Sequence, residues 1–212
     1  MLLIFDLDGT LFQAKQVVML AVRQLLDEMG APAPEEQMIL KNAGQGIDAL
    51  LRRILPDGAE QDAARTRIVE LMSKAITVCG ELYPGVREAV TQLQSEGHKL
   101  VICSNSPDEY IRTVLEFTGI ADAFSRCYSV SGNSSKTELV GRLAKSDIAA
   151  IVIGDTHRDI EAAHANGIPA IAAMYGYGNK QMLAAAEHKA DSPMDVVKCV
   201  HIMSVTSRSY HK

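Results

Sequence analysis

Residues 2–10 read LLIFDLDGT, an apolar run that ends in two aspartates, a glycine and a threonine. An unbroken run of Leu, Ile and Phe predicts a strand buried on both faces, as in a parallel sheet. Asp6 and Asp8 follow at the end of that strand, where open α/β sheets bind their ligands. Alternation places both carboxyl groups on one side, with Leu7 turned away, and Gly9 permits a sharp turn. An Asp-Gly pair also forms ordinary solvated turns, so the other strand ends must be weighed with this one.

Further apolar runs predict the rest of the sheet. They cover residues 100–104, 149–154 and 169–174, with a weaker candidate at 126–130. Helical patterns lie between them at 86–96, 106–117, 136–144 and 158–166. This alternation predicts an α/β fold with a doubly wound, mainly parallel, Rossmann-like sheet. The tail from Cys199 has weak periodicity, and we expect one last helical turn followed by disorder.

The stretch between the first strand and Tyr83 contains no strand-like run. Helical periodicity instead covers residues 15–29, 35–43, 47–55 and 60–79. We therefore expect an all-helical cap of residues 14–81, inserted into a core formed by residues 1–13 and 82–212. A discontinuous core explains why a chain of 212 residues falls between the usual lengths of one and two domains.

Composition excludes several classes of protein. The formal net charge of −5 argues against a nucleic-acid binder held by bulk positive charge. No apolar run approaches the roughly 18 residues of a membrane helix, and no signal peptide is recognisable. The four cysteines are scattered and form no C-x-x-C pair, which fits a reducing cytoplasm. Two of them, Cys103 and Cys127, lie in apolar runs and are expected to be buried.

Polar residues that suit phosphate and metal binding follow three more of the predicted strands. The 100–104 strand ends in Ser-Asn-Ser, whose hydroxyls and backbone N–H groups can face an anion at a helix N-terminus. Lys136 opens a helix, where its charge is unfavourable to the helix dipole, which indicates another role. Asp155 ends the 149–154 strand, and Asp159 lies one turn later. Oxygen ligands of this kind suit Mg²⁺, and the hydroxyl and the lysine suit a phosphate group.

The order DLDGT, SNS, a lone lysine and GDTHRD resembles the haloacid dehalogenase-like hydrolase superfamily. The resemblance runs from Met1 to about Tyr177. It is greatest to the phosphoglycolate phosphatase-like branch, which has a small helical cap. Three stretches support that branch: NAGQGIDALLRRIL, YPGVREAVTQLQSEGHKL and AAHANGIPAIAAMYGYG.

The resemblance implies a Mg²⁺-dependent phosphatase that hydrolyses small phosphate monoesters through an aspartyl-phosphate. Asp6 would be the nucleophile, and Asp8 the general acid and then the general base. Ser104 and Lys136 would bind the transferring phosphoryl group. The lysine is followed here by threonine rather than the proline common in relatives, which leaves Lys145 as an alternative.

The metal would be held by Asp6, by the backbone carbonyl of Asp8 and by Asp155. Asp159 would orient the metal waters or the motif lysine. We expect the partner to be a small phosphorylated metabolite, with no nucleic acid or membrane bound, and the chain to be a monomer or a homodimer.

Substrate contacts are expected from Thr10, from Asn105 and from the cap turn Gly44-Gln45-Gly46, which resembles the loop that meets the leaving group in relatives. Two nearby cations, Lys15 and Lys41, could touch the substrate or lie on the surface, and the sequence leaves both open. Relatives often have an aspartate soon after DGTL, whereas this chain has Phe-Gln-Ala-Lys there, which points to an altered substrate preference.

Two other functions stay open. A sugar phosphomutase could be built on the same core, with the phosphoryl group passed to a second hydroxyl instead of to water. A non-catalytic phosphate-binding relative is the second, although no motif residue is missing. Dehalogenation is disfavoured because halide leaves without a proton or a metal, so Asp8 and Asp155 would have no role.

Overall fold

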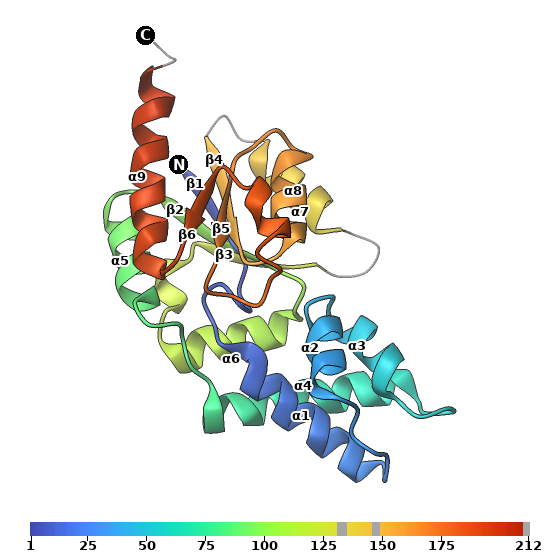
Figure 1. Ribbon diagram of the computed structural model, residues 1–212. Helices are drawn as coiled ribbons and strands as arrows, with labels where there is room; N and C mark the ends of the chain where they lie inside the picture. The colour runs from blue at the N-terminus through green and yellow to red at the C-terminus, as the bar shows by residue number, and fades with distance from the viewer. Residues whose placement is uncertain (131–134, 146–148, 210–212) are drawn as a thin grey trace.

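The computed structural model describes residues 1–130, 135–145 and 149–209 (Figure 1). Its sheet has the strand order β3-β2-β1-β4-β5-β6, and every neighbouring pair is parallel. The strands are β1 (Leu2–Phe5), β2 (Lys99–Ser104), β3 (Arg126–Ser129), β4 (Ala150–Gly154), β5 (Ala170–Ala173) and β6 (His188–Ala190). This order is that of a Rossmann-like, doubly wound sheet, so the predicted fold class is confirmed.

Helices connect the strands, and five of them come before the second strand. They are α1 (Ala14–Glu28), α2 (Glu36–Ala43), α3 (Ile47–Ile54), α4 (Gln61–Cys79), α5 (Val86–Ser95), α6 (Asp108–Thr118), α7 (Lys136–Ala144), α8 (His157–His164) and α9 (Pro193–Ser209). The predicted bounds of the first eight agree with these within about two residues, which is the usual precision of helix ends. In the described part of the chain, no helix combines the length and apolar character needed to cross a bilayer.

The two faces of the sheet bury different side chains of the same strand. Leu3 and Phe5 of β1 pack in one apolar cluster with α5, α6 and α9, and Leu2 and Ile4 pack in another with α7 and α8. All four side chains are at most 5% exposed. The two-sided burial is the reason for the unbroken apolar run in the sequence.

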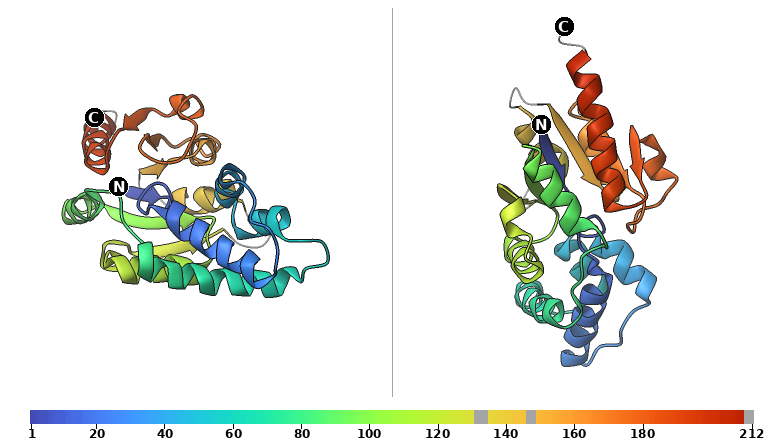
Figure 2. Two further views of the ribbon diagram at one scale, coloured as in Figure 1. Left: turned by 60° about the horizontal axis from the view of Figure 1, so that its bottom comes forward. Right: turned by 90° about the vertical axis from the view of Figure 1, so that its left-hand side faces the viewer.

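The helices α1–α4 lie beyond the end of the sheet where β1 finishes, away from the N-terminus (Figures 1 and 2). Within this group α1 packs on α4, and α4 also packs on α6 of the core. Two antiparallel segments join the group to the sheet. The backbone N–H of Gln13 donates to the carbonyl of Glu81 at 2.8 Å, and the N–H of Tyr83 donates to that of Leu11 at 3.0 Å. The side-chain amide of Gln13 donates to the Leu82 carbonyl at 2.9 Å.

The C-terminal part of the chain differs from expectation. Helix α9 runs through Ser209, where one turn followed by disorder was predicted. Its residues Val196, Val197 and Val200 are at most 2% exposed and form its buried stripe. The stripe is hard to see in the sequence because Ile202 and Val205 are exposed on the same helix. The predicted loss of order falls partly on residues 210–212, which lie outside the described residues.

Two smaller features of the structure also differ from the prediction. Strand β6 was not expected, because its three residues include His188 and Lys189 and carry no apolar run. Cys127 is exposed rather than buried, whereas Cys103 is buried as expected. The reason is position: Cys127 belongs to β3, an edge strand that is covered less than the central β2.

Candidate active site

The first candidate residues sit where β1 ends, beside β2 and β4. The register pairs Phe5 with Ile102 and with Ile153, so the residues after all three strands meet at one edge of the sheet. Asp6 continues the pairing, since its N–H donates to the Ile153 carbonyl at 2.8 Å. This parallel register is the physical reason that motifs about 100 residues apart in sequence converge.

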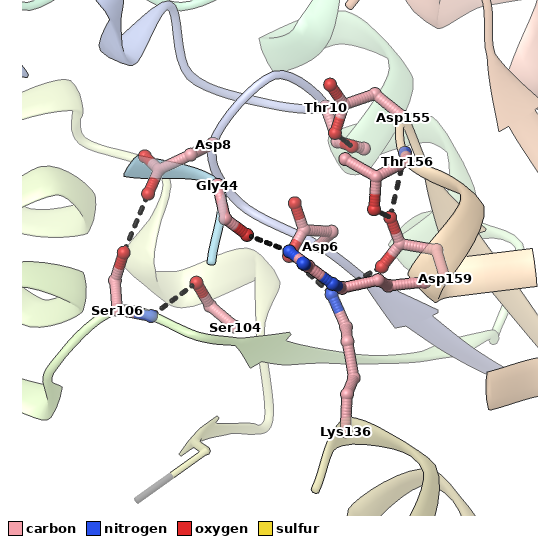
Figure 3. Close-up of polar contacts among 11 residues, drawn as sticks. Asp6, Asp8, Thr10, Gly44, Ser104, Ser106, Lys136, Asp155, Thr156 and Asp159 are labelled. Carbon is pink, nitrogen blue, oxygen red and sulfur yellow. Dashed lines mark hydrogen bonds and ion pairs between the residues drawn. The ribbon is translucent and has the colours of Figure 1, made fainter. Parts of the chain in front are cut away.

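Leu7 is fully buried, as predicted, but the two flanking aspartates take different directions. Asp6 is 7% exposed and faces Lys136, whereas the half-buried Asp8 faces Ser106 (Figure 3). The turn that follows these two aspartates requires glycine at position 9. Gly9 has φ +87°, and a Cβ there would lie 2.2 Å from Oδ2 of Asp155.

Lys136 lies between two carboxylates. Its Nζ atom is 2.6 Å from Oδ1 of Asp6 and forms an ion pair with Asp159. Burial alone lowers the pKa of Lys136, but the charges of Asp159 and Asp6 outweigh it and hold that pKa above its ordinary value. The lysine is the first residue of α7, whose N-cap is Ser135 in a capping box with Glu138. Lys145, the alternative from the sequence, is exposed at the other end of α7.

Asp155 and Asp159 are fully buried. Oδ2 of Asp155 accepts the N–H of Tyr177 at 2.8 Å, and Oδ1 accepts the hydroxyl of Thr10 at 3.5 Å. Oδ2 of Asp159 accepts both the N–H and the hydroxyl of Thr156, at 3.0 and 2.8 Å. Asp159 therefore caps α8 and also pairs with the lysine.

The carboxylates of Asp6, Asp155 and Asp159 form a cluster that could hold a metal ion. Each offers an oxygen, and these oxygens lie within 4.8 Å of one another. Burial raises the pKa of Asp6, and it raises the pKa of Asp155 to about 7, with a further contribution from Asp159. Three buried carboxyl groups beside one lysine leave excess negative charge, which favours a bound cation. An all-oxygen donor set fits Mg²⁺.

The turn after β2 supplies hydroxyls at the same edge. Ser104 is 2% exposed, and its Oγ accepts the N–H of Ser106 at 3.1 Å. Asn105 is half-buried and lies against the turn between α2 and α3, since a Cβ added at Gly46 would be 3.4 Å from its carbonyl oxygen. Of these three residues, Ser106 contacts an aspartate, since its hydroxyl donates to Asp8, and Ser104 contacts Ser106.

The turn Gly44-Gln45-Gly46 joins α2 to α3 and contacts core residues from two segments. One is Asn105, and the other is Arg158, whose Nη1 donates to the Gly44 carbonyl at 2.9 Å. Arg158 was not among the candidates from the sequence, although it lies inside the GDTHRD motif. Its partner Gly44 lies 114 residues away in the sequence, and no local sequence pattern reveals such a contact.

Two lysines, one on α1 and one on α2, were candidates for contact with the substrate. The ammonium group of Lys15 lies 2.7 Å from Oε1 of Glu36, and both side chains are exposed, so an acid already neutralises it. The side chain of Lys41 lies outside the described residues. The loop 175–178 also contacts the site, because the hydroxyl of Tyr175 donates to the Thr10 carbonyl at 2.9 Å and the backbone N–H of Tyr177 donates to Asp155.

Fold, motif order and site together define a family. The model of the haloacid dehalogenase-like hydrolase family matches residues 3–173. The chain belongs to this family.

Comparison with its relatives narrows the class of enzyme further. It is 31% identical to a phosphoglycolate phosphatase of Mannheimia succiniciproducens, over 87% of this chain and 89% of the other. It is 30% identical to a phosphoglycolate phosphatase of Yersinia pseudotuberculosis, over 86% and 84% of the two chains. A solved structure from Haemophilus somnus, described as a predicted phosphoglycolate phosphatase, has a TM-score of 0.82 at 23% identity and covers 94% of this chain and 97% of that one. The chain is a phosphatase of the haloacid dehalogenase-like type.

Proposed function

We propose that this phosphatase is Mg²⁺-dependent, hydrolyses small phosphate monoesters of the phosphoglycolate kind and works through an aspartyl-phosphate on Asp6. One observation carries the proposal. The buried carboxylate of Asp6 bonds Lys136 and shares a cluster with Asp155 and Asp159, at the edge of the sheet where α/β folds bind ligands.

Electrostatics explains why a lysine and a metal are needed. Asp6 is an anion that must approach a phosphate dianion, and the two repel each other unless positive charge lies between them. Lys136 supplies one such charge, and Ser104 supplies a hydroxyl for the phosphoryl oxygens. When bound, Mg²⁺ adds charge that offsets the remaining repulsion, which is most of what phosphoryl transfer requires.

The donors for the metal would be the carboxylates of Asp6 and Asp155 and the backbone carbonyl of Asp8. The side chain of Asp8 is outside the carboxylate cluster, which agrees with a role for its carbonyl. Asp159 would hold Lys136 in place and orient metal-bound water.

The reaction would take two steps. First, an Asp6 oxygen bonds to phosphorus while the bond to the ester oxygen breaks, and Asp8 gives its proton to that leaving oxygen. Then Asp8 takes a proton from water, the water oxygen bonds to phosphorus, and the bond from Asp6 to phosphorus breaks. The products are an alcohol and inorganic phosphate, and both aspartates return to their starting states.

The substrate would enter beneath the helices α1–α4, which we propose form a cap over residues 14–81. The turn at Gly44, Gln45 and Gly46 lies against Asn105, so its backbone would border the leaving group. Thr10 would act indirectly, since its buried hydroxyl bonds Asp155. A small leaving group such as glycolate agrees with this short turn and with the relatives.

A phosphate-release assay tests the proposal. Phosphoglycolate, sugar phosphates, nucleotides and pyrophosphate would be compared with Mg²⁺ and with a chelator. Asp6→Asn removes the nucleophile and is expected to abolish release, by at least about a thousandfold, while Asp27→Asn, an exposed acid on α1, keeps it. Full activity in Asp6→Asn would refute the nucleophile, and transfer to a sugar hydroxyl in place of water would indicate a mutase.

A further inference from the structure

The carboxylate of Asp8 is held at both of its oxygens. Ser106 donates its hydroxyl to Oδ2 at 2.7 Å, and Tyr110 donates its phenol to Oδ1 at 2.9 Å. The two donors come from different places: Ser106 from the turn after β2, and Tyr110 from the first turn of α6. Neither bond belongs to the cluster of Asp6, Asp155 and Asp159.

Tyr110 is an unusual residue to find at this position in the core. It is 0% exposed, and its ring packs edge to face on Phe12, with the ring centroids 6.4 Å apart. A buried phenol oxygen is costly without a partner, and phenylalanine would fill the same apolar space without that cost. The hydroxyl therefore matters through the group it bonds, and that group is Asp8.

The position of the phenol suits orientation and not contact with substrate. A group packed wholly inside the core approaches Asp8 from the protein side, so the half-buried carboxylate keeps its other side toward the site. Two charge-assisted hydrogen bonds, one to each oxygen, fix the plane of a carboxylate that would otherwise rotate about its Cβ–Cγ bond. General acid catalysis depends on such placement within hydrogen-bond reach of the leaving oxygen.

We propose that Tyr110 is a positioning residue that, together with Ser106, holds Asp8 in the orientation for proton transfer. This inference rests on the acid–base role of Asp8 in the proposed function. If Tyr110 had a purely structural role, its replacement would lower activity toward every substrate equally. If it positions Asp8, the loss of activity would be greater for substrates whose leaving group needs a proton.

The leaving group therefore provides the test. Alkyl phosphates such as phosphoglycolate release an alkoxide that needs a proton, whereas p-nitrophenyl phosphate releases a stable phenolate that does not. For Tyr110→Phe we expect kcat/KM for phosphoglycolate to fall about tenfold or more, and kcat/KM for p-nitrophenyl phosphate to fall less than about threefold. Thr118→Val is the matched control, since it also removes a buried hydroxyl from α6, one that bonds the Val114 carbonyl.

Two further variants test the proposal if the tyrosine variant folds poorly. Ser106→Ala removes the other donor and should show the same selective loss. In an Asp8→Asn background, adding Tyr110→Phe should change kcat/KM by less than about twofold, because the group that it orients is already altered.

The outcomes separate the two proposals. Equal losses for both substrates, or a full further loss in the Asp8→Asn background, would overturn the positioning role while leaving the phosphatase mechanism intact. Failure of the unmodified chain to release phosphate from any ester would overturn the proposed function, and the inference with it.

Discussion

The Nζ atom of Lys136 lies 2.6 Å from Oδ1 of Asp6, although 130 residues separate them in the chain. The parallel register of β1 and β4 and the N-terminus of α7 bring them together. The same lysine pairs with Asp159, so one cation is shared by two buried acids. Removing it would leave those acids without their compensating charge.

Lys136→Met is therefore expected to lose both activity and stability. Activity should fall by at least about a thousandfold, because the phosphoryl charge is no longer offset. The free energy of unfolding should fall by about 3–5 kcal/mol, which is typical when one partner of a buried ion pair is removed. Phosphate release and urea unfolding measure the two effects. Lys145→Met, on the exposed end of the same helix, serves as control, and comparable damage there would contradict the assignment of the motif lysine.

Magnesium should stabilise the chain, and more so at higher pH. Burial raises the pKa of Asp6 and Asp155 above 3.8, the latter to about 7, so the folded metal-free state binds more protons than the unfolded state between these values. Its stability therefore falls as pH rises through that window. A metal ion needs the deprotonated carboxylates, so it offsets this loss most where they are ionised.

The measurement is the melting temperature with and without Mg²⁺ at about pH 5 and about pH 8. At saturating metal we expect a rise of about 5–10 °C at the higher pH and a clearly smaller one at the lower. Asp155→Asn should remove most of the difference. A shift that is equal at both pH values would count against metal binding at these carboxylates.

Gly176→Ala should weaken the metal site without touching a catalytic group. A Cβ at this position would lie 2.3 Å from both the Cβ of Asp155 and the Gly9 carbonyl, so the loop or the aspartate must shift. We expect the Mg²⁺ concentration for half-maximal activity to rise about tenfold or more, as for other changes in groups that support metal ligands. Gly167→Ala is the comparison, since its Cβ meets open space and its positive φ affects stability alone. An unchanged Mg²⁺ requirement in Gly176→Ala would show that the loop adapts.

Arg158→Ala should act on substrate binding. The guanidinium donates to the Gly44 carbonyl and so would hold in place the turn that we propose borders the leaving group. Without it we expect KM for phosphoglycolate to rise about three- to tenfold, the equivalent of one hydrogen bond, with a smaller change in kcat. Steady-state kinetics give both constants. Arg142→Ala, an exposed arginine of α7, is the control, and a loss confined to kcat would refute this role.

Three of the motif residues could be predicted from the sequence because each stands at the end of an apolar run. Parallel strands place their carboxyl ends at one edge, so Asp6, Ser104 and Asp155 had to converge once the strand order was understood. Tyr110 could not be found in this way. It lies on a helix face among apolar neighbours, and only the folded structure shows that its ring packs on Phe12 and its hydroxyl reaches Asp8.

Other differences between prediction and structure arose where the apolar pattern of a segment does not match the burial of its side chains. Strand β6 is short and polar, and it is recognisable only by its pairing with β5. The buried stripe of α9 is masked by exposed Ile202 on the same helix. Arg158 shows the same limit, because its partner belongs to the inserted helices. The sequence therefore did not reveal these contacts between segments that lie far apart in the chain.

The hydrogen bonds that tie Gln13 to Glu81 and Leu82 have a mechanical consequence. The chain leaves the sheet and returns to it through two segments that are fastened together, so neither can bend without the other. We expect helices α1–α4, of which α4 packs on α6, to move as one body on this double stem. Access to the aspartates would then depend on the stiffness of the hydrogen bonds in this stem.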